Sequence, residues 1–298
     1  MELEQVELIK YLGVIDQNLN FRSHVNYKYT KRRRFSTTDQ DYGPKASNLI
    51  ADMEADVFLK KRQEFLQQLQ HVDKKDTFNN TILQSNCDTW KRERQKRITA
   101  SNFGKICKLR KTTSTAKTVS SLLYSSFMGS QATTFGLEKE SIAIALFEKK
   151  TGKTVNKSGL VIDDNLPYLA CSPDGLIDNH AIIEIKSSLK SGNLSPVDAV
   201  LQKKIDYCFL DNGNVVLKRN YNYFFQIQGL LHITKTDVCY FVIYTNGGLH
   251  VEEIVRDDTF WIRKMEKRLV DFYLNSLLPE LVDPRRSQQQ DIRNVYLT

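Results

Sequence analysis

The sequence predicts an α/β domain, in which helices surround a central β-sheet. A long helical pattern precedes a run of short strand patterns, and a second helical pattern, a hairpin and a last helix follow them. The chain has 298 residues, enough to bury one large hydrophobic core, or one core and a small accessory unit. Its composition, 41% hydrophobic and 26% charged, is typical of a globular protein.

The first 86 residues are predicted to form a separate N-terminal extension. Residues 1–45 are polar and basic, and the Gly43-Pro44 break near their end favours a loop or a mobile arm. Apolar residues then recur at helical spacing over about 48–70, which predicts one amphipathic helix. A linker is expected over 71–86.

The core is predicted over residues 87–282, and a polar C-terminal tail over 283–298. Short helical pieces are expected at 90–109, and a strong helix at 135–150 ends at Gly152, a natural C-cap. The later elements are strands at 154–161, 168–172 and 181–186, helical turns within 187–220, a helix at 221–233, a hairpin formed by 238–244 and 249–255, and a helix at 258–277.

The positive charge of the chain is clustered. The net charge is +8, and nine basic residues with a single acid, Glu93, lie between Lys91 and Lys111. Clustered positive charge suits phosphate backbones, because binding releases condensed counterions. A solvated basic face that binds nothing specific is the alternative.

An intracellular location is expected for this chain. No apolar run approaches the roughly 20 residues that a membrane helix needs, and residues 1–10 lack the features of a secretory signal. Five scattered cysteines without a C-x-x-C pair argue against a disulfide framework or a cysteine-ligated metal. The basic run Lys31–Arg34 allows the nucleus, or another DNA-containing compartment.

A constellation of charged residues lies at the centre of the predicted core. Asp174 sits between Pro173 and Gly175, which favour a tight turn after an apolar strand. Glu184 and Lys186 are two residues apart in the next strand, so their side chains point to the same side. Such charges need partners in a core, and Mg²⁺ would supply one through carboxylate and carbonyl oxygens. A structural ion pair beside a common Asp-Gly turn is the alternative.

Five short motifs surround this constellation. They are W-K-R-E-R-Q-K-R-I-T-A-S at 90–101, G-L-E-K-E at 136–140, S-P-D-G-L at 172–176, E-I-K at 184–186 and Y-F-F-Q-I-Q-G at 223–229. In order and spacing they resemble the lambda exonuclease/YqaJ viral recombinase family, within the PD-(D/E)XK nuclease superfamily. The resemblance covers about residues 90–279. It implies a restriction-endonuclease-like core with a central mixed β-sheet flanked by helices, to which this chain adds a mostly helical N-terminal extension.

The resemblance also implies roles for the residues of the constellation. Asp174 and Glu184 would be the principal ligands of Mg²⁺, for which Mn²⁺ could substitute, with the Ile185 carbonyl as a further oxygen. Glu140 would reach the metal directly or through water, and Glu138 is the alternative to it. The remaining catalytic residues would be Lys186, which would orient the attacking water, and Gln228, which would hold that water or a phosphate oxygen. For Gln228, hydrogen bonding to the backbone alone is the alternative.

Two residues of the first motif correspond to a grip on a terminal 5′-phosphate. These are Arg94 and Ser101, whose guanidinium fork and hydroxyl suit a phosphate monoester. Three neighbours, Lys91, Arg92 and Arg97, are expected to contact backbone phosphates without sequence preference. The alternatives are a generally basic surface and a serine that only caps a helix.

The resemblance therefore predicts a Mg²⁺-dependent deoxyribonuclease that binds duplex DNA ends, and no membrane. A 5′→3′ exonuclease that leaves 5′-phosphate mononucleotides is expected, in DNA recombination, repair or viral-type processing. A structure-selective endonuclease and a catalytically inactive DNA-binding module are the alternatives. A homo-oligomer, such as the trimeric ring of phage members, is expected by analogy only.

Overall fold

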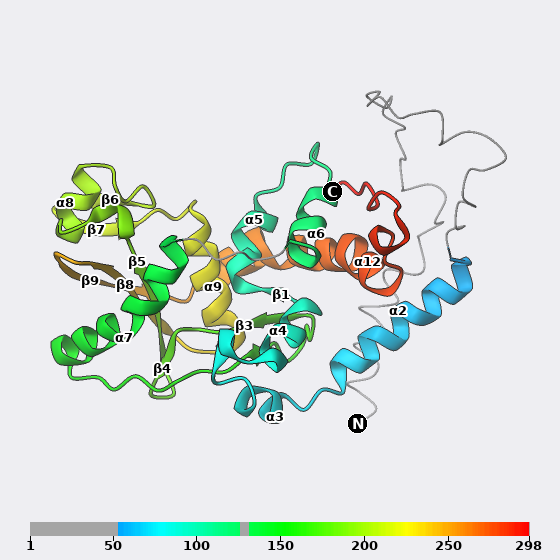
Figure 1. Cartoon of the computed structure of the whole chain (residues 1–298), viewed down its shortest axis with the longest axis horizontal. Helices are drawn as coiled ribbons and strands as arrows, with labels where there is room; N and C mark the ends of the chain where they lie inside the picture. Colours follow the sequence, from blue (N-terminus) through cyan, green and yellow to red (C-terminus); the bar gives the residue numbers. More distant parts are fainter. Residues whose placement is uncertain (1–52, 126–130, 298) are drawn as a thin grey trace. The chain divides into compact units, whose positions relative to one another are not determined.

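The computed structural model describes residues 53–125 and 131–297 (Figure 1). The predicted arm over 1–45 and its basic run at 31–34 lie outside the described residues, as does the start of the helix predicted at 48–70. Within the described ranges, no helix is both long and apolar enough to cross a membrane.

A mixed four-stranded sheet forms the centre of the domain, as the sequence predicts. Its strands are β4 (Gly175–Ile177), β5 (Ala181–Ser187), β8 (Val238–Thr245) and β9 (Gly248–Val255). They lie in the order β4-β5-β8-β9, with β5 and β8 parallel and the other two pairs antiparallel. Apolar residues fill most of β5 and β8, and both strands are buried along most of their length.

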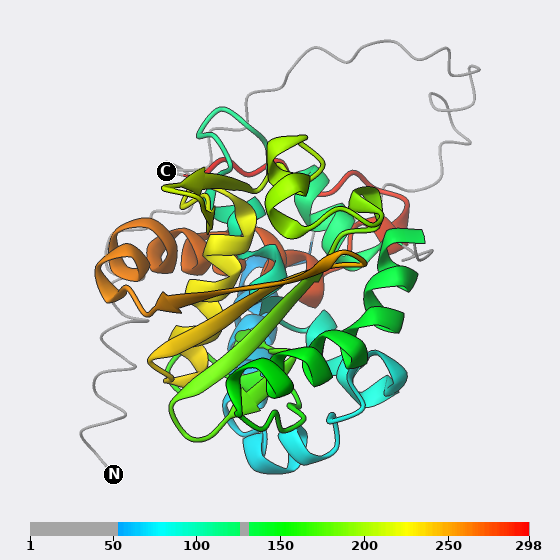
Figure 2. The same ribbon diagram turned by 90° about the vertical axis from the view of Figure 1, so that its left-hand side faces the viewer.

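The two faces of this sheet carry different side chains. One face packs against α7 (Gln131–Thr151) through an apolar cluster that includes Phe147. The other face lies against α9 (Asn222–Thr234) and carries Glu184 and Lys186 among apolar neighbours. Figures 1 and 2 show these two helices on opposite sides of the strands. The sheet therefore presents one largely apolar face and one face with an enclosed charge pair.

The segment expected to be a linker, 71–86, contains two helical turns. The elements before the core are α2 (Ala55–Gln70), α3 (Lys74–Asn79) and the 3-10 turn η2 (Gln84–Asn86). The α3 helix is too short to show an apolar period, but Asp73 caps it by accepting a hydrogen bond from the Asp76 amide. Thr81 accepts a hydrogen bond from the Leu160 amide at 2.8 Å. The segment is therefore packed against the core and does not act as a free linker.

Short helical pieces follow, as predicted for 90–109. They are α4 (Asp88–Gln95), η3 (Ala100–Asn102), α5 (Phe103–Cys107) and, further on, α6 (Ala116–Leu123). A second, three-stranded sheet has the order β1-β3-β2, formed by β1 (Ile98–Thr99), β2 (Val161–Ile162) and β3 (Leu169–Cys171). The strand expected at 154–161 is shorter than predicted: β2 begins only at Val161, and an isolated bridge at Asn156 is the one piece of sheet pairing before it among the described residues of that segment.

The long connection over 187–220 contains helical turns, as predicted, and also a hairpin. Its elements are η4 (Leu189–Ser191), α8 (Pro196–Leu201), β6 (Cys208–Asp211) and β7 (Asn214–Leu217). Ser195 caps α8 through the Asp198 amide. The backbone amide of Leu217 donates to Glu252 of β9 at 2.8 Å, so the hairpin is tied to the edge of the central sheet.

The last helical region is nearly continuous from residue 258 to residue 282, five residues beyond the predicted end. It consists of α10 (Asp258–Phe260), the π-helical η5 (Trp261–Glu266), α11 (Lys267–Phe272), the π-helical η6 (Tyr273–Leu277) and α12 (Leu278–Val282). The tail after it, which includes the 3-10 turn η7 (Arg286–Gln288), is pinned to the domain. The Thr115 amide donates to the Val295 carbonyl at 2.9 Å, and Arg293 pairs with Asp283.

Candidate active site

Three acidic side chains from three elements lie near the middle of β5, close enough to influence one another electrostatically. Asp174 lies in the turn just before β4, and its Oδ2 accepts a hydrogen bond from the Ile185 amide at 2.7 Å. Glu184 projects from β5, and Glu140 from α7 lies close enough for its charge to act on Glu184. In an extended strand the carbonyl of a residue points the same way as its amide. The Ile185 carbonyl is therefore directed to the same edge as Asp174.

Glu184 is the most buried of the three acids, with 2% of its surface exposed. Its Oε1 accepts hydrogen bonds from Lys186 Nζ at 2.5 Å and from Gln226 Nε2 at 2.7 Å. Its Oε2 is buried and has no hydrogen-bond partner among the described residues. A buried carboxylate oxygen without a partner is costly in an isolated protein. This oxygen is therefore available to bind a cation.

The electrostatics of the cluster show an excess of negative charge. Burial raises the pKa of Asp174 well above its usual value, Glu184 and Glu140 raise it further, and Lys186 opposes them. Burial and then Glu184 also raise the pKa of Glu140. Burial alone would lower the pKa of Lys186, but Glu184 and Asp174 outweigh it and raise the pKa, so the lysine stays charged.

The donor set fits a hard divalent cation. Two or three carboxylates and a backbone carbonyl are oxygen ligands of the kind that Mg²⁺ takes, together with waters. The unpartnered Glu184 Oε2 and the raised pKa of Asp174 fit a pair of carboxylates that a shared cation would stabilise. Within the described ranges, no three carboxylate, imidazole or thiolate groups already stand at mutual distances that suit one metal ion.

A second cationic group lies beside the turn that carries Asp174. The Arg94 guanidinium stacks over the Trp90 ring, 4.0 Å from its centroid, and burial lowers the pKa of Arg94 to about 10. The Trp90 indole N–H donates to Ser172 Oγ at 3.0 Å, two residues before Asp174. Among the described residues no carboxylate forms an ion pair with Arg94. An exposed serine, Ser101, lies nearby in sequence, with its hydroxyl 3.3 Å from that of Thr99.

Comparison with known families decides the classification. The family model of the YqaJ-like viral recombinase domain matches residues 89–237, which is half of the chain. The chain belongs to this family. The matched range includes Arg94, Asp174, Glu184 and Lys186, and the resemblance predicted from the motifs is thereby confirmed.

Solved structures show the same fold. The alkaline exonuclease LHK-Exo from Laribacter hongkongensis has 22% sequence identity and a TM-score of 0.52, over 68% of this chain and 97% of that one. The structure of LHK-Exo in complex with dAMP has 20% identity and a TM-score of 0.51, over 66% and 95%. These likenesses confirm the predicted α/β fold. A sequence comparison with curated proteins found no match.

In the YqaJ-like domain, the glutamine that contacts Glu184 is not Gln228, the one that the sequence suggests. Gln226 donates to Glu184, whereas Gln228 is 1% exposed and is used entirely by the backbone. Gln228 Nε2 donates to the Val255 carbonyl at 3.0 Å, and its Oε1 accepts from the Asp257 amide at 2.7 Å. The assignment of Gln228 to the site is therefore corrected. Side chains two positions apart on an α-helix point to different faces, so Gln226 and Gln228 cannot both face Glu184.

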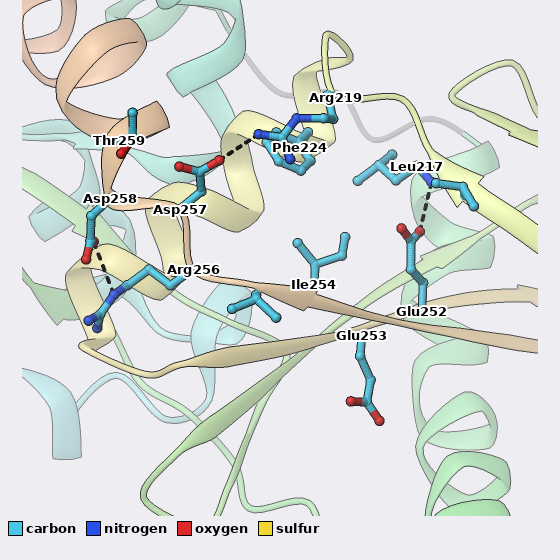
Figure 3. Close-up of a pocket in the computed structure, with 12 residues that line it drawn as sticks. Leu217, Arg219, Phe224, Glu252, Glu253, Ile254, Arg256, Asp257, Asp258 and Thr259 are labelled. Carbon is cyan, nitrogen blue, oxygen red and sulfur yellow. Dashed lines mark hydrogen bonds and ion pairs between the residues drawn. The ribbon is translucent and has the colours of Figure 1, made fainter.

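Gln228 instead supports the junction between β9 and α10, beside a hollow of about 560 Å³ (Figure 3). The charged groups that line this hollow are largely paired with one another. Arg219 bonds Asp257 at 2.6 Å, and Arg256 bonds Asp258 at 3.2 Å. None of the predicted site residues lines this hollow.

The predicted backbone contacts of the first motif divide into two groups. Lys91 and Arg92 are exposed and make only local contacts within α4. Arg97 is buried, with its guanidinium bonded to the Pro167 carbonyl and to Glu93 at 2.5 Å. The assignment of Arg97 to DNA contact is therefore corrected, because its side chain has no exposed surface.

Besides Gln226, the sequence analysis missed two further groups of this site. Tyr223 lies one helical turn before Gln226, and Lys186 Nζ sits 4.7 Å from its ring centroid. The spacing of three along a predicted helix was the available signal, because residues three apart share a face. Gln84 of η2 donates through its Nε2 to the carbonyls of both Ser158 and Pro173, at 3.0 and 3.1 Å. Nothing in a single sequence marks this residue, since it lies in a segment that looks like a linker.

Proposed function

We propose that the protein is a metal-dependent DNA nuclease, and specifically a 5′→3′ exonuclease on duplex DNA that leaves 5′-phosphate mononucleotides. The observation that carries the proposal is the buried Glu184, with one oxygen held by Lys186 and Gln226 and the other without a partner, beside Asp174. A structural ion pair would not need two further carboxylates at the same place. The YqaJ-like family and the exonuclease fold support the same reaction class.

The residues of the site can divide the work of phosphodiester hydrolysis. Asp174, Glu184, the Ile185 carbonyl and Glu140 would hold Mg²⁺, for which Mn²⁺ can substitute. A bound cation of this kind polarises a phosphoryl oxygen and lowers the pKa of water. Lys186 stays charged, so it can hold the attacking water or the developing negative charge.

The exonuclease part of the proposal rests on Arg94. A guanidinium that is stacked on Trp90 and free of a carboxylate partner among the described residues suits a terminal phosphate monoester. Trp90 links it to Ser172, which is two residues from Asp174, so the phosphate grip and the metal ligands share one turn. The YqaJ-like description of the family supports a place in DNA recombination or viral-type DNA processing.

Linear duplex DNA with a labelled 5′-phosphate tests the proposal. Mononucleotide release is expected in Mg²⁺, and none in EDTA or with Lys186→Ala. The matched control is Lys190→Ala, an exposed lysine of η4, which should cleave normally. Slower release from a 5′-hydroxyl end, together with loss of that difference in Arg94→Ala, would support the terminal grip. Cleavage of circular DNA would indicate an endonuclease, and binding without cleavage in Mg²⁺ or Mn²⁺ would refute the enzyme.

A further inference from the structure

A row of two tyrosines flanked by two lysines leads away from the candidate site. Lys186 Nζ lies 4.7 Å from the Tyr223 ring centroid, and the Tyr223 and Tyr221 centroids are 5.2 Å apart. On the other side of Tyr221, Lys108 Nζ lies 6.0 Å from the Tyr221 ring centroid. We call these four residues the tyrosine–lysine row. Tyr221 and Tyr223 are both partly exposed.

The row is held in place by neighbours that leave its rings partly open. The buried Tyr207 ring lies edge-on to Tyr223 at 5.0 Å and tilted to Tyr221 at 5.7 Å. Burial, and then the negative charge of Asp206, raise the pKa of the Tyr221 hydroxyl, so this group stays neutral. Lys108 donates to the Asn220 carbonyl at 3.1 Å, which fixes the ammonium group next to that ring.

Close backbone packing brings Lys108 to this position. The α5 helix, which ends just before Lys108, lies against the start of α9 (Figure 1). A Cβ atom on Gly104 of α5 would stand only 2.6 Å from the Asn222 Cα, so this approach requires glycine. The meeting of the lysine and the two tyrosines is therefore a consequence of helix packing.

The charge around the row favours anions. From Arg94 to Leu137 the sequence has eight basic residues and no acidic one. Among the described residues, neither Lys105 nor Lys108 forms an ion pair with a carboxylate; Lys105 donates to Ser121 Oγ instead. Of the acids near the row, Glu184 is paired with Lys186, and Asp206 lies near Tyr221. An aromatic surface in a positive field is the combination that binds single-stranded nucleic acid.

We propose that the tyrosine–lysine row binds unpaired nucleotides of a DNA strand, with a base on the Tyr221 ring and a phosphate on Lys108. The inference rests on the proposed nuclease function, because the row begins at Lys186 of that site. Bases inside a duplex already stack on one another and present no free face. The row therefore favours DNA with unpaired bases over fully paired DNA.

Fluorescence anisotropy with the full chain in EDTA tests the row without cleavage. The probes are a labelled 12-nucleotide single strand and a blunt duplex of the same sequence. Tyr221→Leu should weaken single-strand binding about tenfold, whereas Tyr221→Phe, which keeps the ring, should change it less than twofold. Lys108→Ala should lower the slope of log affinity against log salt by about 0.7. Blunt duplex affinity should change little in the two tyrosine variants.

Matched controls are Tyr296→Leu and Lys75→Ala, which remove an exposed tyrosine and an exposed lysine elsewhere. Equal losses for Tyr221→Leu and Tyr221→Phe, or equal losses on single strand and duplex, would overturn the proposal. So would a single-strand affinity that neither Tyr221→Leu nor Lys108→Ala reduces. Because the readout is binding without metal, a protein that binds through the row but never cuts would refute the nuclease and leave the row standing. Cleavage by a protein whose single-strand affinity depends on neither Tyr221 nor Lys108 would refute the row and leave the nuclease standing.

Discussion

The two faces of the central sheet put the same strand to different uses. Toward α7, β5 contributes Ile183 and Ile185 to an apolar cluster with Phe147. Toward α9, the alternate residues Glu184 and Lys186 are charged; Glu184 is buried, and Lys186 keeps 20% of its side chain exposed. The first face supplies stability through area buried from water. The second gives up part of that stability for a charge cluster, which is the pattern expected where a site is built into a fold.

The largest predicted effect comes from the charged face. Glu184→Gln keeps the size of the side chain but removes a charge from the cluster. We expect DNA cleavage to fall by about a thousandfold, since several kcal/mol of transition-state stabilisation would depend on the metal that Glu184 is proposed to hold. The free energy of unfolding should stay the same or rise, because the repulsion with Asp174 and Glu140 is removed. Single-turnover cleavage and urea denaturation measure the two effects, and a large loss of stability would contradict the contrast.

The opposite outcome is expected from the apolar face. Phe147 is fully buried and packs against Tyr240, with ring centroids 5.4 Å apart. Phe147→Ala should lower the free energy of unfolding by about 3–5 kcal/mol. The protein that remains folded should still cleave DNA, because this side chain contacts none of the carboxylates. Denaturation midpoints and activity per folded molecule, measured below the unfolding transition, check both halves. If folded Phe147→Ala lost cleavage as completely as Glu184→Gln does, the two faces would not differ in function and the comparison would be wrong.

The two glutamines of α9 sharpen the same comparison. Gln226→Ala removes a donor to Glu184 and should lower cleavage by about 10- to 100-fold with little effect on stability. Gln228→Ala leaves the Val255 carbonyl and the Asp257 amide without their partner, so stability should fall by about 1–3 kcal/mol. Cleavage by folded Gln228→Ala should be near normal. Thermal denaturation beside single-turnover kinetics would decide, and a reversed pattern would restore Gln228 to the site.

Local sequence patterns were sufficient for the centre of the fold. The alternation in β5 predicted that Glu184 and Lys186 share a side, and their contact at 2.5 Å agrees with it. The helix at 135–150 and the 238–255 hairpin also follow from periodicity and turn residues. Assignments that depend on the direction in which a single side chain points were weaker. Gln228 and Arg97 carry the right chemical groups but face the backbone and Glu93.

Contacts between distant parts of the chain could not be predicted. The segment 71–86 looks like a linker because α3 is six residues long and has no apolar period. Its packing depends on the Gly159 backbone, where a Cβ would meet the Phe78 carbonyl oxygen at 2.0 Å. Such a close approach joins residues about eighty positions apart, and neither partner shows it locally.

Gln84 of this segment gives the smallest predicted effect and the most specific one. It holds the Pro173 carbonyl next to Asp174 from outside the range that the family model matches. Gln84→Ala should lower kcat about tenfold and raise the Mg²⁺ concentration needed for half-maximal cleavage, because the turn carrying Asp174 is less fixed. KM for DNA should change little, since Gln84 is not placed to contact the substrate. Gln68→Ala, an exposed glutamine on α2, is the matched control. An unchanged Mg²⁺ requirement with lower stability would show that Gln84 only joins the segment to the core.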